Sequence, residues 1–148
     1  MTDRTPGAVL FACNLNVIRS PMAAALLRAH SGGRIYTASA GVRSGRDDPF
    51  VAAVMQEIGL DLGGHVPHDF ESLGDLNFDL IVSLTPEAHH KAVELTRAAD
   101  VATEYWPTMD PTQEEGSRDR RIAAYRELRQ QLSRRIAERF PRVSTFAG

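Results

Sequence analysis

The sequence predicts one α/β domain in which a four-stranded parallel sheet lies between helices, in three α/β/α layers. Short β-like runs alternate along the chain with helix-like stretches, which is typical of a parallel sheet covered on both faces. Two of these runs, Ala8–Cys13 and 80–84, are almost continuously apolar, as strands buried on both faces tend to be. No linker or repeat divides the chain, so a single domain over residues 1–148 is expected.

Four strands and four helices account for the pattern. The expected strands are residues 8–13, 34–38, 80–84 and 104–106. The expected helices are residues 21–30, 49–58, 86–99 and about 117–140. Three helix starts place an N-cap residue before proline, at Ser20-Pro21, Asp48-Pro49 and Thr85-Pro86. In the last helix, apolar residues recur every three or four positions, which predicts one face packed on the core.

Composition narrows the function classes. The 148 residues include 17 basic and 19 acidic side chains, a net charge of −2, so no general attraction to nucleic acid or membrane is expected. No apolar run approaches the roughly 20 residues of a spanning helix, and the first residues lack the layout of a secretory signal. The single cysteine, Cys13, excludes an internal disulfide and a multi-thiolate zinc site. We expect a cytoplasmic protein, a monomer or weak dimer, that needs no metal or cofactor.

The end of the first predicted strand carries the strongest functional signal. Cys13 is followed after five residues by Arg19, and a helix then begins. A loop in this position can offer consecutive backbone N–H groups to a phosphate, and the helix dipole adds positive charge. The same field favours a cysteine thiolate, and a guanidinium can bind two phosphate oxygens. The alternative is a buried structural cysteine before an ordinary turn.

The spacing therefore predicts a phosphate site and a nucleophile within it. The thiolate of Cys13 would attack phosphorus and form a phospho-cysteine intermediate. The predicted phosphate-binding residues are Asn14, Leu15, Asn16, Val17, Ile18 and Arg19.

This loop resembles the Cys-x-x-Asn-x-x-Arg-Ser-Pro loop of the low-molecular-weight protein tyrosine phosphatases. The match runs in register from Cys13 to Pro21. Further landmarks extend the resemblance along nearly the whole chain: Ser39-Ala40-Gly41, Gly64-His65, residues 78–84 and Asp110-Pro111. The resemblance implies the fold of that family and the hydrolysis of phosphotyrosine or another phosphomonoester, in a phosphorylated protein or a small molecule.

The resemblance also implies four catalytic residues. Cys13 would be the nucleophile and Arg19 the phosphate clamp. Ser20 would hydrogen-bond the thiolate and help it leave when water attacks the intermediate. Asp110 would protonate the leaving oxygen and then activate the water, as general acid and base.

A supporting network is implied in the same way. Asn16 would hold a strained position in the loop, braced by hydrogen bonds with Ser39 and His65. For both of these residues an ordinary structural role is the alternative.

The predicted pocket walls depart from the family pattern. Residues 43–45 and Thr112-Gln113 stand where the family often has aromatic residues, so stacking against a phosphotyrosine ring would lose its usual partners. Tyr105, Trp106 and Phe50 are the candidates to replace them. Val17 is a candidate determinant of which phospho-residue is preferred.

Other departures concern the loop and its charge. Ile18 replaces a second cysteine, so no protective disulfide with Cys13 can form. Leu15 replaces a glycine, and Thr85 replaces an aspartate. Arginines at positions 118, 120 and 121 suggest a basic rim that recruits an acidic or multiply phosphorylated substrate, and a solvated helix face is the alternative.

Two other functions compete with hydrolysis. Arsenate reductases share this loop because arsenate mimics phosphate, but with one cysteine the chain would need an external thiol. The missing aromatic residues also leave open a phosphate-binding regulatory module with weak turnover.

Overall fold

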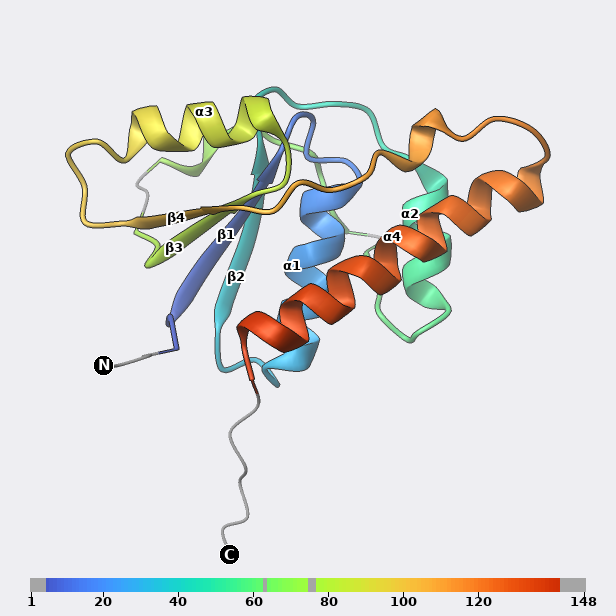
Figure 1. Cartoon of the computed structure of the whole chain (residues 1–148), viewed down its shortest axis with the longest axis horizontal. Helices are drawn as coiled ribbons and strands as arrows, with labels where there is room; N and C mark the ends of the chain where they lie inside the picture. The colour runs from blue at the N-terminus through green and yellow to red at the C-terminus, as the bar shows by residue number, and fades with distance from the viewer. Residues whose placement is uncertain (1–4, 63, 75–76, 142–148) are drawn as a thin grey trace, which may run out of the picture.

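The predicted fold is confirmed: the chain forms a four-stranded, fully parallel sheet with helices on both faces (Figure 1). The computed structural model describes residues 5–62, 64–74 and 77–141, so both ends of the predicted domain lie outside the described residues. The strand order is β2-β1-β3-β4. The strands are β1 (Ala8–Cys13), β2 (Tyr36–Gly41), β3 (Leu80–Ser83) and β4 (Ala102–Tyr105).

The helices form one layer on each side of the sheet. In Figure 1, α1 (Arg19–His30), α2 (Pro49–Gln56) and α4 (Arg118–Arg139) lie together on one face, and α3 (Pro86–Leu95) covers the other. Side chains of β1 alternate between the layers, because successive residues of a strand point to opposite faces. Val9 and Phe11 pack in the core with α1 and α4, while Leu10 and Ala12 pack with α3.

Two short 3-10 helices complete the fold. They are η1 (Glu71–Leu73) and η2 (Pro111–Gln113). The sheet order places β1 between β2 and β3, so the chain leaves β1 for one neighbour and later returns to the other side. Parallel sheets bind ligands beyond the carboxyl ends of their strands at such a switch point. The loop after β1 occupies that position.

The expected second and fourth strands needed correction. The sequence predicts the second strand at 34–38, but β2 begins at Tyr36 and continues to Gly41, because Ser39, Ala40 and Gly41 pair in register with the last three residues of β1. The fourth strand begins at Ala102, two residues before the expected start, because Ala102 pairs with Leu80. Small or polar residues gave no local strand signal at these positions, so the pairing partner decides both boundaries.

The predicted helix caps are confirmed at two of three sites. The carboxylate of Asp48 accepts a hydrogen bond from Phe50 N, and the Thr85 hydroxyl accepts one from Ala88 N. The Ser20 prediction is wrong. The first helix begins at Arg19, its N-cap position is Ile18, and the hydroxyl of Ser20 bonds to active-site side chains instead.

The long helix α4 is anchored by its apolar face and by contacts with α2. Its buried face consists of Ile122, Ala124, Tyr125, Leu128, Leu132 and Ile136. The Tyr125 hydroxyl donates to Asp48 Oδ2 at 2.6 Å, so α4 also fixes the residue that caps α2. Burial and the hydrogen bond to Asp48 both raise the pKa of Tyr125 above its usual range, which keeps this hydroxyl a donor.

Glu57 joins the end of α2 to α4 through two arginines, Arg126 at 2.7 Å and Arg129 at 2.8 Å. Hydrogen bonds from these arginines lower the pKa of Glu57 to about 2. Because the folded value lies below the unfolded value, the carboxylate stabilises the fold above pH 4.5 and loses this effect as the pH falls toward 2.

We expect Glu57→Gln to lower the free energy of unfolding at pH 6, with a difference from wild type that shrinks as the pH falls to 3. Urea unfolding at each pH measures this difference. Glu138→Gln is the control, because Glu138 is exposed and forms no ion pair within the described ranges. A difference that stays constant with pH would contradict the assigned charge effect.

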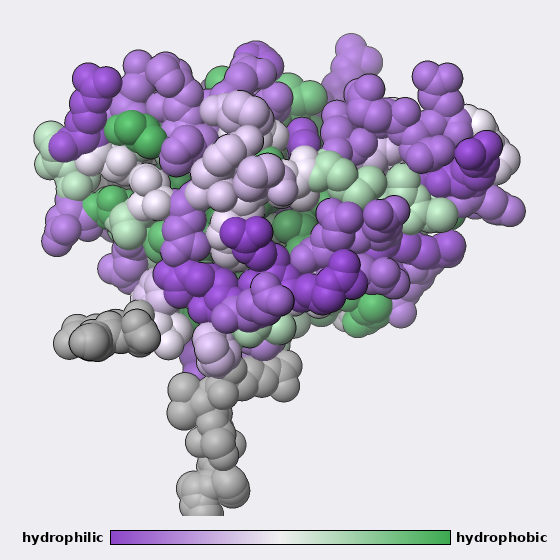
Figure 2. Space-filling view, viewed as in Figure 1, coloured by the Kyte–Doolittle hydropathy of each residue, from purple (hydrophilic) through white to green (hydrophobic). Residues whose placement is uncertain are grey.

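The surface is mainly hydrophilic. Figure 2 shows polar residues over most of the face in view, with hydrophobic residues in small separate areas. The large exposed hydrophobic residues are scattered along the chain, with two of them in α3: Leu15, Tyr36, Ile58, Val66, Val93 and Leu95. None of the helices in the described part of the chain has the length and apolar composition needed to cross a bilayer.

Candidate active site

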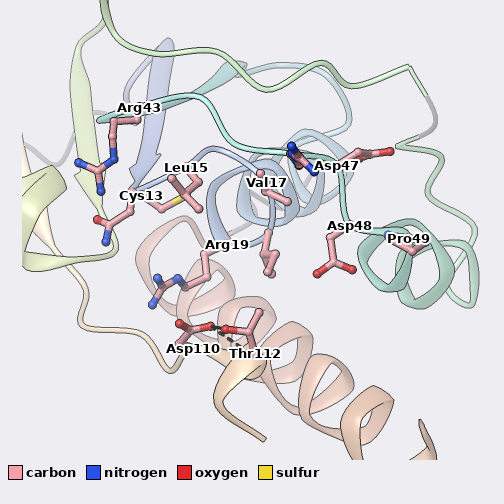
Figure 3. Close-up of a pocket in the computed structure, with 13 residues that line it drawn as sticks. Cys13, Leu15, Val17, Arg19, Arg43, Asp47, Asp48, Pro49, Asp110 and Thr112 are labelled. Atoms are coloured by element: carbon pink, nitrogen blue, oxygen red, sulfur yellow. Dashed lines mark hydrogen bonds between the residues drawn. The ribbon is translucent and has the colours of Figure 1, made fainter.

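A cavity of about 540 Å³ opens at the carboxyl end of β1 (Figure 3). It brings together three of the four predicted catalytic residues, Cys13, Arg19 and Asp110, from the end of β1, the start of α1 and the loop before η2. Ser20 lies directly behind Cys13. The other residues that line the cavity are Asn14, Leu15, Val17, Ile18, Arg43, Arg46, Asp47, Asp48, Pro49 and Thr112.

The backbone of the loop after β1 presents its N–H groups to the cavity side. The carbonyls of Cys13, Asn14 and Leu15 accept hydrogen bonds from the N–H groups of Val42, Arg43 and Gly45, and the Asn16 carbonyl contacts His65. A trans peptide points its carbonyl and the following N–H in opposite directions. The N–H groups of residues 14–17 therefore face away from these partners, toward the cavity.

These N–H groups form a concave set of donors. Within the described residues, none of the backbone N–H groups of 14–18 donates a hydrogen bond to another protein atom. The positive end of the α1 dipole adds to the same field. Consecutive free amides at a helix start are a site for a tetrahedral anion such as phosphate.

Cys13 lies at the base of this loop with its thiol hydrogen-bonded to Ser20. Cys13 Sγ and Ser20 Oγ are 2.9 Å apart, and both residues are buried. The Ser20 hydroxyl also receives a hydrogen bond from Asn16 Nδ2 at 2.9 Å. The hydroxyl hydrogen then has two acceptors within reach, the Cys13 sulfur at 2.9 Å and the Ala40 carbonyl at the longer distance of 3.4 Å, and when it points at the sulfur it would stabilise a thiolate.

Asn16 has a left-handed backbone, with φ at 58°, and it is fully buried. Asparagine tolerates this conformation better than most residues. Its side chain bridges the two sides of the loop: Nδ2 donates to Ser20, and Oδ1 accepts from His68 N at 3.0 Å. Asn16 thus holds the strained turn that directs the neighbouring amides inward.

The predicted network around Asn16 differs from the observed one. His65 occupies the expected position, with Nε2 at 2.8 Å from the Asn16 carbonyl. Ser39 does not: in the described part of the chain its side chain makes no hydrogen bond to Asn16 or to His65. Ser39 lies in β2 opposite Phe11, and Ser20 and the main chain of His68 supply the bonds that Ser39 was expected to make.

Gly41 allows β2 to pass close to the loop. A Cβ at this position would lie 2.8 Å from Asn16 N and 2.9 Å from the Asn14 carbonyl oxygen, and would also meet the Arg43 carbonyl. These are backbone atoms, so they cannot move aside as a flexible side chain can.

We expect Gly41→Ala to destabilise the fold by roughly 1–3 kcal/mol and to lower activity by displacing the loop. Thermal unfolding and kcat with para-nitrophenyl phosphate measure the two effects. Gly64→Ala is the matched control, because a Cβ there meets nothing within 4 Å. Equal behaviour of the two variants would show that β2 does not constrain the loop.

Arg19 connects the phosphate loop to the segment that carries Asp110. Its Nη1 donates to the Thr108 carbonyl at 3.0 Å, and Figure 3 shows its guanidinium directed toward Asp110. Asp110 caps η2, with its Oδ1 accepting from Thr112 N at 3.0 Å and from the Thr112 hydroxyl at 2.7 Å. The carboxylate is therefore held at the cavity wall by its own turn.

The charge state of Asp110 follows from these contacts. Partial burial raises the pKa of Asp110, but the hydrogen bonds from Thr112 and the charge of Arg19 outweigh it, and the net pKa is lowered. Asp110 is thus an anion at neutral pH when the cavity holds no phosphate. A bound phosphate would offset the charge of Arg19 and raise the pKa of this carboxyl again.

None of the three proposed substitute aromatic residues lines the cavity. Trp106 is buried against Phe11, Tyr105 stacks on His89, and Phe50 packs on Tyr125. The described cavity wall is aliphatic near the loop, with Leu15, Val17 and Ile18 among its residues.

The predicted basic rim on α4 is also absent from the cavity. The guanidinium groups of Arg118 and Arg121 lie over the Phe50 ring, at 5.7 and 5.2 Å from its centroid. The third arginine is directed to another partner, with Arg120 Nε 3.9 Å from Glu114 Oε2. The arginines that do line the cavity, besides Arg19, are Arg43 and Arg46.

The loop after β1 also contacts α3. The Thr85 hydroxyl donates to Asn14 Oδ1 at 2.6 Å, and Asn14 Nδ2 donates to Glu87 Oε1 at 3.2 Å. Thr85 was recognised as a helix cap, but its second bond depends on β1 and β3 being neighbours. Nothing local in the sequence indicates it.

Comparison with known proteins decides the family. The family model described as low molecular weight phosphotyrosine protein phosphatase matches residues 8–143. The chain belongs to this family. The match covers every strand of the sheet and all four predicted catalytic residues.

Similar proteins carry two kinds of name. An arsenate reductase of Bacillus subtilis is 26% identical over 130 residues, covering 88% of this chain and 92% of that protein. A glutaredoxin arsenate reductase of Synechocystis is 33% identical over 76 residues, 51% of this chain and only 58% of that protein.

Solved structures show the same division. The Erwinia amylovora tyrosine phosphatase superposes with a TM-score of 0.73 at 21% identity, covering 95% of this chain and 94% of that one, and this likeness supports the fold alone. An arsenate reductase in its phosphate-binding state superposes with a TM-score of 0.70 at 25% identity, covering 93% of this chain and 98% of that one.

Proposed function

We propose that the protein is a phosphatase that hydrolyses phosphomonoesters, with protein phosphotyrosine as the leading substrate, through a phospho-cysteine intermediate. One observation carries the proposal: a nucleophile, a set of inward backbone N–H groups, a guanidinium and a carboxylate meet in one cavity. Binding a phosphate would require only the amides and Arg19. A buried thiol and a carboxylic acid on opposite sides of the same site suit a displacement at phosphorus.

The geometry suggests a role for each group. The Cys13 thiolate attacks phosphorus while the loop amides and Arg19 stabilise the charge on the equatorial oxygens. Asp110 donates a proton to the leaving oxygen. Water then attacks the phospho-cysteine with Asp110 as base, and the Ser20 hydroxyl stabilises the departing thiolate.

Hydrolysis of para-nitrophenyl phosphate by the reduced protein between pH 5 and 8 tests the proposal. A panel of phosphotyrosine, phosphoserine and phosphothreonine peptides then tests the preference for phosphotyrosine. No release of phosphate from any substrate by folded, reduced protein would contradict hydrolysis and favour a phosphate-binding regulatory module.

A second candidate, arsenate reduction, rests on the names of similar curated relatives. Because Cys13 is the one cysteine in the sequence, the chain cannot pass electrons along a series of its own thiols. Two external thiols would be needed. The first attacks arsenylated Cys13, forms a mixed disulfide with it and releases arsenite. The second attacks that mixed disulfide, restores the Cys13 thiol and leaves joined to the first thiol as a disulfide. Arsenate-dependent oxidation of glutathione distinguishes this reaction from hydrolysis.

A further inference from the structure

The segment that follows β2 lies along the phosphate loop and is fixed to it. Arg43 N donates to the Asn14 carbonyl and Gly45 N to the Leu15 carbonyl, both at 2.9 Å. Gly45 packs so closely on Leu15 and Val17 that a Cβ there would lie within 3 Å of both side chains. The backbone from which Arg43 and Arg46 extend therefore has a fixed position relative to a bound phosphate.

Both arginines line the cavity and neither is firmly paired. Arg43 Nη1 lies 3.5 Å from Glu87 Oε2, and both side chains are more than half exposed, so this ion pair is weak. Arg46 is exposed and forms no ion pair with any described residue. Two cationic groups thus remain available beside the site, in addition to Arg19.

Of the three acidic residues that line the cavity, Asp110 belongs to the catalytic site, and the other two form no ion pair with Arg43 or Arg46 among the described residues. Asp48 already accepts hydrogen bonds from Phe50 N and from the Tyr125 hydroxyl. The Asp47 carboxylate points away from Cys13 in Figure 3. Because no aromatic residue of the described ranges lines the cavity, a phosphorylated ring finds no stacking partner among them, and the charge of the groups around the phosphate becomes the main basis for selecting a substrate.

We propose that Arg43 and Arg46 form a second anion subsite, so that the preferred substrate carries a carboxylate or a second phosphate close to the phosphate that is hydrolysed. This inference rests on the proposed phosphatase function and names the substrate class. The second anion comes either from an acidic side chain beside the phosphorylated residue of a peptide or from the leaving group of a small phosphomonoester. An exposed ion pair of this kind contributes modestly to substrate binding. The two arginines together therefore give a preference of about 3- to 10-fold for the acidic substrate over the neutral one.

The test compares substrates that differ in one feature. Three phosphotyrosine peptides of equal length have glutamate, glutamine or lysine on both sides of phosphotyrosine. Phenyl phosphate and its ring-carboxylated analogue form the small-molecule pair. The preference is the ratio of kcat/KM for the acidic and the neutral member, and we expect it to fall with added salt. A ratio above one only for the peptides, or only for the small molecules, identifies the source of the second anion.

Substitutions then assign the preference to these arginines. In Arg43→Gln/Arg46→Gln the ratio should fall to about one, while Arg34→Gln, an exposed arginine at the opposite end of β2, should keep the wild-type ratio. Glu87→Gln releases Arg43 from its weak partner and should increase the ratio. A wild-type ratio near one for both pairs, or a ratio that survives the double substitution, would overturn the inference.

A binding measurement separates this inference from the proposed function. Calorimetric titration of the Cys13→Ser variant with the same peptides and small molecules needs no turnover. Absence of hydrolysis by the wild-type protein, together with tighter binding of the acidic members to Cys13→Ser, would refute the phosphatase and retain the subsite. Hydrolysis of all substrates by the wild-type protein, together with equal affinity of Cys13→Ser for the acidic and neutral members, would retain the phosphatase and refute the subsite.

Discussion

Cys13→Ser is expected to lower kcat for para-nitrophenyl phosphate by a factor on the order of 10⁴ or more, because it removes the nucleophile of the covalent step. A serine hydroxyl at this position has no neighbouring base to activate it. Within the described residues, the side chain at this position contacts the Ser20 hydroxyl, which can stabilise an anion but is not a base. Steady-state release of para-nitrophenol measures the loss.

Binding should survive the same change. The loop amides and Arg19 remain in place, and serine is smaller than cysteine, so the affinity for inorganic phosphate should stay within several-fold of wild type. Calorimetric titration with phosphate provides that measurement, and thermal unfolding checks the fold. Activity within tenfold of wild type would show that another group attacks phosphorus.

Much of the fold and the centre of the site could be predicted because their signals are local. Buried parallel strands have apolar runs, helix starts have cap residues before proline, and the Cys13–Arg19 spacing spans a single loop. Asp48 and Thr85 behave as the caps that their sequence predicts. Ser20 fails as a cap because the sulfur of Cys13 and the amide of Asn16 compete for its hydroxyl.

The parts that escaped prediction depend on contacts between distant segments. The main chain of His68 carries no sequence signal, yet its N–H replaces the expected Ser39 in the network of Asn16. The cavity walls are a second case. Arg43 reaches the loop only because β2 pairs with β1, and the arginines of α4 turn to Phe50 instead.

Asp110→Asn is expected to reduce kcat by about 10²–10³-fold for phenyl phosphate, because the asparagine amide cannot protonate the leaving oxygen. The decrease should be smaller for para-nitrophenyl phosphate, whose leaving group is much less basic and depends less on an acid. Asparagine keeps the size and the oxygen of Asp110, so the turn to Thr112 should persist. Thr112→Val serves as the matched control, since it removes one bond to Asp110 and leaves the acid in place.

The pH dependence separates proton donation from a structural effect. In the free site, Thr112 and Arg19 keep the pKa of Asp110 below its usual range, so the acid is deprotonated before phosphate binds. Bound phosphate offsets Arg19 and brings negative charge to the carboxyl, so its pKa rises in the complex. We therefore expect the alkaline decline of kcat, which reports the complex, to lie at higher pH than the corresponding decline of kcat/KM.

In Asp110→Asn the alkaline decline of kcat should disappear, because no proton remains to be lost from this position. An equal decrease in kcat for both substrates, with the alkaline decline preserved, would assign proton donation to another residue. That outcome would leave Asp110 as the residue that shapes the turn before η2 and holds Thr112 beside the cavity. Loss of the decline together with the larger effect on phenyl phosphate would instead tie the proton transfer to this carboxyl, because a structural defect would slow both substrates alike.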